Sequence, residues 1–90
     1  MPKVIFTPAL KKFFPGMKLQ TISPGTVFEA ILELEKTYPG LKTYLLEDND
    51  ALRKHVNIYI GNNLIKDRDN LSDLLNEKDE LYILQALSGG

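Results

Sequence analysis

The sequence predicts a small two-layer α+β domain in which one helix packs on a sheet. Several short segments alternate apolar and polar residues with period two, as strands with one buried face do. One segment, 27–38, instead spaces its apolar residues as an amphipathic helix does. With 90 residues, 43% of them hydrophobic, the chain can bury one compact core.

The first expected element is a strand over residues 3–7, a β-branched and aromatic run that ends before Pro8. Residues 13–16 read as a turn because they end in Pro15-Gly16. Residues 17–22 alternate again and predict a second, half-buried strand. The two strands are expected to form an opening hairpin with a long loop.

The main helix is expected to begin after Ser23-Pro24-Gly25, which breaks the preceding strand. Thr26 and Glu29 have the spacing of a capping box. The predicted buried face consists of Val27, Ile31, Leu34 and Tyr38. Glu35 lies near the edge of that face, and the sequence assigns it no partner. Pro39-Gly40 ends the helix, and residues 41–46 predict another helical turn before an acidic loop.

The second half contains the clearest strand, residues 55–60, with Val56, Ile58 and Ile60 on its expected inner side. Residues 61–63 tolerate positive φ angles, so residues 64–66 predict a short returning strand. Leu71, Leu74 and Leu75 look like the buried side of a brief helical turn. After a charged turn at 77–80, residues 81–86 form an apolar strand suited to the interior of a sheet.

Composition excludes several function classes. The 11 basic and 12 acidic residues give a net charge of −1, so no excess of Lys and Arg is present to bind nucleic acid. Without cysteine, the chain forms no disulfide, thiolate nucleophile or zinc–thiolate site. We expect no metal site, because the acidic run at 67–73 lacks the glycine of a calcium loop. No leader or membrane span is recognised, so a cytoplasmic protein is expected.

Strand alternation also predicts an apolar surface. If the inner residues face the helix, the opposite face of the sheet carries Ile5, Tyr59, Tyr82 and Leu84. One helix cannot cover both faces of a sheet, and exposed apolar patches commonly mark partner surfaces. The alternative is that Phe13 and Phe14 from the first loop fold over this face.

The chain ends in Ser88-Gly89-Gly90, directly after the last strand. Glycine has no Cβ atom, so this end can enter a channel too narrow for other residues. We therefore expect a domain over residues 1–86 and a flexible tail over 87–90, which reaches roughly 13 Å when extended. A meaningless flexible end or a linker remnant would have the same composition.

Three parts of the chain carry a family resemblance: the segment 56–60, the Asp79-Glu80 turn with the strand after it, and residues 86–90. Together with the order of elements, they resemble the MoaD and ThiS family of sulfur carriers, which have the β-grasp, ubiquitin-like fold. Within that family, the segment 53–61 and the chain length are more similar to the CysO-type carriers of cysteine biosynthesis. The small subunit of molybdopterin synthase is also close.

The resemblance implies that a ubiquitin-activating-type enzyme adenylates the Gly90 carboxylate with ATP, and that sulfide then converts it to a thiocarboxylate. Ser88 and Gly89 would thread into the partner. Leu87 would bind the partner at the base of the tail, or else be the last core residue of the strand. The face with Ile5, Tyr59, Tyr82 and Leu84, expected from alternation alone, would dock the activating enzyme and then the acceptor enzyme. The chain would be a carrier without a cofactor of its own, not an enzyme. The acceptor would be a cysteine-synthase-like enzyme or the molybdopterin-synthase large subunit. The alternative is a ubiquitin-like protein modifier or a plain interaction module.

Overall fold

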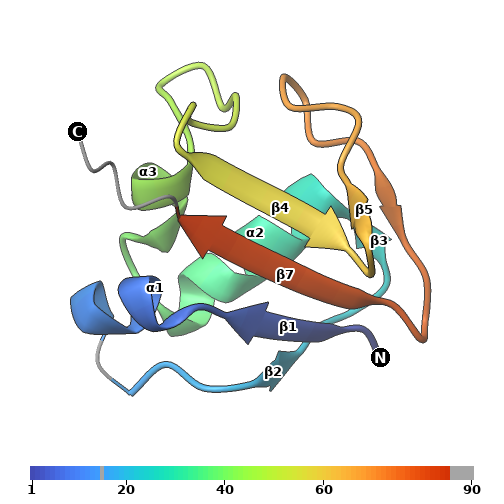
Figure 1. Cartoon of the computed structure of the whole chain (residues 1–90), viewed down its shortest axis with the longest axis horizontal. Helices are drawn as coiled ribbons and strands as arrows, with labels where there is room; N and C mark the ends of the chain where they lie inside the picture. Colours follow the sequence, from blue (N-terminus) through green and yellow to red (C-terminus); the bar gives the residue numbers. More distant parts are fainter. Residues whose placement is uncertain (15, 86–90) are drawn as a thin grey trace.

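A mixed five-stranded sheet forms one layer of the molecule, and a long helix packs across one face of it (Figure 1). The computed structural model describes residues 1–14 and 16–85, apart from the side chains of Ala9 and Phe13. The elements in chain order are β1 (Lys3–Phe6), α1 (Pro8–Phe13), β2 (Gln20–Thr21), β3 (Gly25–Thr26), α2 (Val27–Thr37), α3 (Leu41–Leu45), β4 (Val56–Ile60), β5 (Asn63–Leu64), β6 (Leu74–Leu75) and β7 (Glu80–Gln85).

The last strand in sequence lies in the middle of the sheet, whose spatial order is β2-β1-β7-β4-β5. β7 pairs in parallel with β1 and antiparallel with β4 (Figure 1). A parallel pair needs a long crossover, and the chain between β1 and β7 supplies it with α2 on one face. The chain therefore runs toward its C-terminus along the central strand.

The core fills the space between the sheet and α2. It includes Val4 and Phe6 of β1, Val27, Ala30, Ile31 and Leu34 of α2, Val56 and Ile58 of β4, and Leu81 and Ile83 of β7, all buried. Apart from Ala30, these are positions that strand and helix periodicity predict. Tyr38, which is expected on the buried face of the helix, follows its last residue and is only partly buried. Ile60 is only partly buried and packs against the edge of the core.

α2 begins with the predicted capping box. The Glu29 amide donates to the Thr26 hydroxyl oxygen at 3.1 Å, and the Thr26 amide donates to the Glu29 carboxylate at 2.9 Å. Two of the free amides at the start of the helix thereby gain partners. The prediction of a main helix with this start and a Pro39-Gly40 end is confirmed.

The predicted long loop after β1 is wrong, because residues 8–13 form the helix α1. Pro8 suits the first helical turn, where its missing N–H would be unpaired in any case. The predicted strand over 17–22 is reduced to β2, which pairs with Lys3 and Val4. Leu19 is 57% exposed, so the alternation there does not follow one buried face.

The predicted helical turn at 71–75 is also wrong. Leu74–Leu75 forms β6, which pairs antiparallel with β3, and Leu74 is 69% exposed instead of buried. The Val27 amide donates to the Asp73 carbonyl at 2.9 Å, and the Phe28 amide donates to the Leu71 carbonyl at 3.0 Å. The segment is held extended because its carbonyls accept hydrogen bonds from the start of α2.

The returning strand is β5, one residue earlier than predicted. Gly61 adopts a positive φ of 61° in the turn before it, a conformation that favours glycine. Within the described residues, no helix combines the length and hydropathy that crossing a membrane requires.

Candidate functional site

Four apolar and aromatic side chains form one patch on the outer face of the sheet, opposite α2. Ile5 of β1, Tyr82 of β7 and Tyr59 of β4 are register partners in one row. Leu84 lies two residues after Tyr82 and therefore shares its face. All four are partly buried. We call these four residues the outer patch. Their position is as predicted from alternation, and their role in partner binding stays a prediction.

The outer patch is not covered by the helices of the described chain. In Figure 1, α2 lies behind the sheet, and α1 and α3 lie beyond the end of the strands. Phe14 packs edge-on against Tyr44 of α3, with ring centroids 5.7 Å apart. Phe14 is thus engaged at the end of the sheet, and the side chain of Phe13 lies outside the described residues.

Tyr82 and Glu80 form a polar pair at the edge of this patch. The Tyr82 hydroxyl donates a 2.7 Å hydrogen bond to the Glu80 carboxylate. This hydrogen bond, followed by desolvation and the charge of Glu80, raises the pKa of Tyr82 above its usual value. The phenol therefore remains a neutral donor at physiological pH.

β7 ends where several elements meet. Gln85 pairs with Val56 at the start of β4, and its side-chain oxygen accepts a hydrogen bond from the Tyr44 hydroxyl of α3. Figure 1 shows α1 and α3 on either side of this end of the strand. The predicted tail residues Leu87, Ser88, Gly89 and Gly90, and the predicted boundary between residues 1–86 and 87–90, lie outside the described residues.

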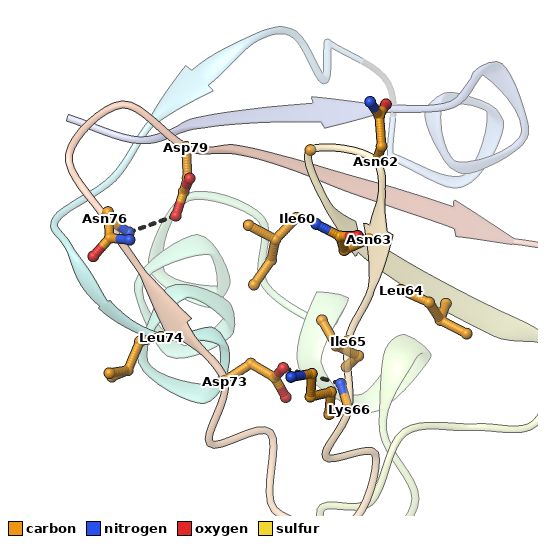
Figure 2. Close-up of a pocket in the computed structure, with 11 residues that line it drawn as sticks. Ile60, Asn62, Asn63, Leu64, Ile65, Lys66, Asp73, Leu74, Asn76 and Asp79 are labelled. Atoms are coloured by element: carbon orange, nitrogen blue, oxygen red, sulfur yellow. Dashed lines mark hydrogen bonds between the residues drawn. The ribbon is translucent and has the colours of Figure 1, made fainter.

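A groove between β5 and β6 lies near the opposite end of the sheet (Figure 2). Its carboxylates serve local hydrogen bonds: the Lys66 amide donates to Asp73 at 2.9 Å, and the Asn76 amide donates to Asp79 at 2.7 Å. Asp73 also accepts from the Asp67 amide. Figure 2 shows the apolar side chain of Leu74 pointing away from the groove. The groove presents no converging set of reactive groups.

The acidic residues between positions 67 and 73 organise their own loop. The Ser72 hydroxyl and the Asn70 amide donate hydrogen bonds to the Asp67 carboxylate. These bonds lower the pKa of Asp67, and the bond from Ser72 has the larger effect. Leu71 is buried in this loop with a positive φ of 55°. Among residues 1–14 and 16–85, no group of three or more His, Cys, Asp or Glu side chains is placed to hold a metal ion.

Sequence reasoning missed two charged side chains that shape the surroundings of β7. Glu35 accepts from the Gly40 amide at 3.0 Å and the Lys42 amide at 2.8 Å, so it caps the start of α3. These two backbone hydrogen bonds lower the pKa of Glu35, and the bond from Gly40 has the larger effect. Arg68 donates to the carbonyls of Arg53 and Val56 at 2.7 and 2.8 Å. No local sequence pattern predicts the contacts of Glu35 or of Arg68.

Comparison with known proteins identifies the family. The sequence model of the ThiS family matches residues 7–90. The chain belongs to the ThiS family. This ThiS-family chain is 29% identical over 77 residues to the sulfur carrier protein CysO of Mycobacterium tuberculosis, covering 83% of each protein. The predicted membership of the MoaD and ThiS group is therefore confirmed.

Solved structures place the same ThiS-family chain among ubiquitin-like proteins. The Amycolatopsis orientalis BexX/CysO complex contains a chain that is 26% identical, with a TM-score of 0.85 and full coverage of both chains. The small archaeal modifier protein 1 of Methanosarcina acetivorans is 32% identical, with a TM-score of 0.79, and the match covers 99% of this chain and 95% of that one. The predicted β-grasp fold is confirmed, with two short helices in addition to the main one.

Proposed function

We propose that this chain is a sulfur carrier whose Gly90 carboxylate is first adenylated and then converted to a thiocarboxylate. A carboxylate oxygen attacks the α-phosphate of ATP, and pyrophosphate leaves. Sulfide next attacks the carbonyl carbon, and AMP leaves, so that one sulfur atom replaces one oxygen atom. The thiocarboxylate then delivers its sulfur to an acceptor enzyme.

The observation that carries this proposal is the extent of the family match, which runs through residue 90 and so includes the diglycine end. A carboxylate is a poor acyl donor because oxide is a poor leaving group, so activation must precede transfer. The relatives named sulfur carriers match most of both chains, which supports the same role here.

In this proposal, the chain itself carries and presents the reactive group but catalyses nothing. It has no cysteine to act as a nucleophile. A ubiquitin-activating-type partner binds ATP and supplies the catalytic groups. The outer patch of Ile5, Tyr59, Tyr82 and Leu84 docks that partner, while Ser88 and Gly89 thread into its active site. Leu87 binds at the base of the tail.

For the acceptor, we favour a cysteine-synthase-like enzyme, because the curated relatives carry the name CysO. The molybdopterin-synthase large subunit is the next candidate. Loss of the gene should then cause a partial requirement for cysteine in the host, with normal activity of molybdenum-cofactor enzymes. The opposite pair of phenotypes would favour the molybdopterin pathway.

The absence of cysteine allows a sharp test of the thiocarboxylate. A thiol-reactive probe finds no cysteine in this chain, so labelling of protein purified from its native host reports a sulfur nucleophile formed afterwards. We expect the label on Gly90 by peptide mass spectrometry. A mass change of the intact protein alone is insufficient, since oxidation of Met1 or Met17 adds nearly the same mass.

The matched control is deletion of Gly90, which leaves the domain of residues 1–86 intact. It should abolish labelling without changing the thermal unfolding midpoint. Absence of the label on wild-type protein in cells supplied with sulfide would contradict the proposed function.

A protein modifier is the second candidate, favoured by the 32% identity to the small archaeal modifier protein 1. In that case, Gly90 forms an isopeptide bond with lysines of other proteins. Affinity-tagged protein from the native host should then appear as a ladder of conjugates in denaturing gels. Tryptic digestion should leave residues 79–90 attached to target lysines, because Lys78 is the last Lys or Arg of the chain. A single band with a labelled terminus favours the carrier.

A further inference from the structure

We propose that Tyr44 is a positioning residue that fixes, through Gln85, the point at which the C-terminal tail leaves the sheet. The inference rests on the proposed function, since it concerns how the Gly90 carboxylate is presented to the adenylating enzyme. Its structural basis is the convergence of α1, α3, β4 and β7 at the end of the last strand.

The contact at this end joins two layers of the fold. Gln85 is the last described residue and lies on the inner side of the sheet, since it pairs with Val56 and follows Ile83 by two residues. The Tyr44 hydroxyl donates a hydrogen bond to the Gln85 side-chain oxygen. Gln85 is a polar residue at the end of an otherwise apolar inner face. An apolar residue at this position could not accept the hydrogen bond from Tyr44.

Tyr44 is itself held from two sides. Its ring packs edge-on against Phe14, the residue that follows α1, at an interplanar angle of 85°. Its helix α3 is capped by the Glu35 carboxylate, which accepts the Gly40 and Lys42 amides. The hydroxyl is therefore presented from a supported position, as a side chain that orients another group must be.

The consequence concerns the length and order of the tail. If the chain is fixed at Gln85, the tail expected over residues 87–90 begins close to the end of the sheet. If the last two residues of β7 fray, the segment that must be ordered on binding is two residues longer. Each additional mobile residue must then be ordered when the tail enters the partner's channel, which weakens productive binding. The hydrogen bond from Tyr44 to Gln85, which we call the anchor, acts on binding of the carrier and not on the chemical step.

The test compares two tyrosine–glutamine pairs of the same chain. Tyr44→Phe removes the anchoring hydroxyl and keeps the ring. The matched control is Tyr38→Phe, because the Tyr38 hydroxyl also bonds a strand glutamine, accepting from Gln20 at 2.9 Å, but at β2. Gln85→Met removes the acceptor, and Gln85→Glu keeps an acceptor oxygen and should rescue the anchor.

Two readouts are needed, amide hydrogen exchange of the isolated carrier and ATP–pyrophosphate exchange with the host's adenylating enzyme. For Tyr44→Phe, we expect roughly three- to tenfold faster exchange at Leu84 and Gln85 and a similar rise in KM for the carrier, with kcat unchanged. Gln85→Met should change hydrogen exchange and KM as much as Tyr44→Phe does. The double variant Tyr44→Phe/Gln85→Met should show no larger change than either single variant. Tyr38→Phe and Gln85→Glu should keep the wild-type KM within about twofold.

The outcomes separate this proposal from the function on which it rests. Unchanged hydrogen exchange in Tyr44→Phe overturns the anchor. Faster exchange with an unchanged KM shows a purely structural contact and overturns the positioning role. An equal rise in KM for Tyr38→Phe does the same, because it points to general loss of stability. If the wild-type carrier supports no ATP–pyrophosphate exchange, the proposed function itself fails, and the positioning role fails with it.

Discussion

Glu35 illustrates, at the scale of single residues, how one carboxylate connects two helices. It is near the end of α2, yet it accepts hydrogen bonds from the Gly40 and Lys42 amides at the start of α3. A charged acceptor forms stronger bonds with amides than a neutral one. The charge of Glu35 therefore contributes to the position of α3 and of Tyr44 within it.

Replacing Glu35 by Gln should lower the free energy of unfolding by about 1 kcal/mol at neutral pH. Folding lowers the pKa of Glu35 from its ordinary value of 4.5. The Glu35 charge therefore stabilises the fold fully at pH values above this ordinary pKa. Its stabilising effect is lost as the pH falls through the lower pKa of the folded state. Urea denaturation at neutral and acidic pH checks this: the difference between wild type and Glu35→Gln should shrink on acidification.

The control for this prediction is Asp48→Asn, which removes an exposed acidic charge from the loop after α3. It should change the free energy of unfolding by less than about 0.5 kcal/mol at either pH. A Glu35→Gln deficit that stays constant with pH would contradict a role for the carboxylate charge.

At the scale of elements, the start of α2 is the best defined local structure in the chain. Thr26 and Glu29 form two reciprocal hydrogen bonds. The Val27 amide donates to the Asp73 carbonyl, and the Phe28 amide donates to the Leu71 carbonyl. The start of the helix is therefore held both by its own sequence and by a segment more than forty residues away.

Replacing Thr26 by Ala should destabilise the protein by about 1 kcal/mol, because the Glu29 amide loses its acceptor. The matched control is Thr37→Ala at the exposed C-terminal end of the same helix, where alanine has the higher helix propensity. Thermal and urea unfolding of the two variants measure the difference. Equal stability of both would show that the β6 segment alone suffices to hold the start of α2.

At the scale of the whole molecule, the sheet has one face packed on α2 and one face that carries the outer patch. The inner face supplies stability, since Val4, Val56, Ile58, Leu81 and Ile83 are fully buried. Two residues of the outer patch, Tyr82 and Leu84, lie on the central strand β7, after which the expected tail follows. In the proposed function, a partner that receives the tail contacts the patch at the same time.

Tyr82→Asp and Leu84→Asp should each weaken binding to the adenylating enzyme roughly tenfold or more, because a charge replaces an apolar contact. Both side chains are partly exposed, so the domain should stay folded. Isothermal titration calorimetry measures the affinity, and circular dichroism checks the fold. Leu74→Asp, at a side chain that is 69% exposed on β6, is the control and should bind as wild type does. Wild-type affinity of all three variants would exclude the outer patch as the docking surface.

Local periodicity was sufficient to predict most of the inner face of β4 and β7, most of the buried face of α2, and its capping box. These features depend on residues two to four positions apart. The two exceptions are Ile60 and Tyr38, which are only partly buried. Local periodicity failed at residues 8–13 and 71–75. A six-residue helix carries little periodicity, and Leu71 and Leu74 have the same residue type although one is buried and the other exposed.

The residues of the candidate site divide in the same way. The sequence by itself determined the apolar outer patch and the diglycine end, since alternation and residue type suffice for both. Only the tertiary structure decided that β7 lies between β1 and β4, that Glu35 caps α3 and that Tyr44 reaches Gln85. Tyr44 and Gln85 are separated by 41 positions, and their contact exists only because the whole core brings α3 to the end of the central strand.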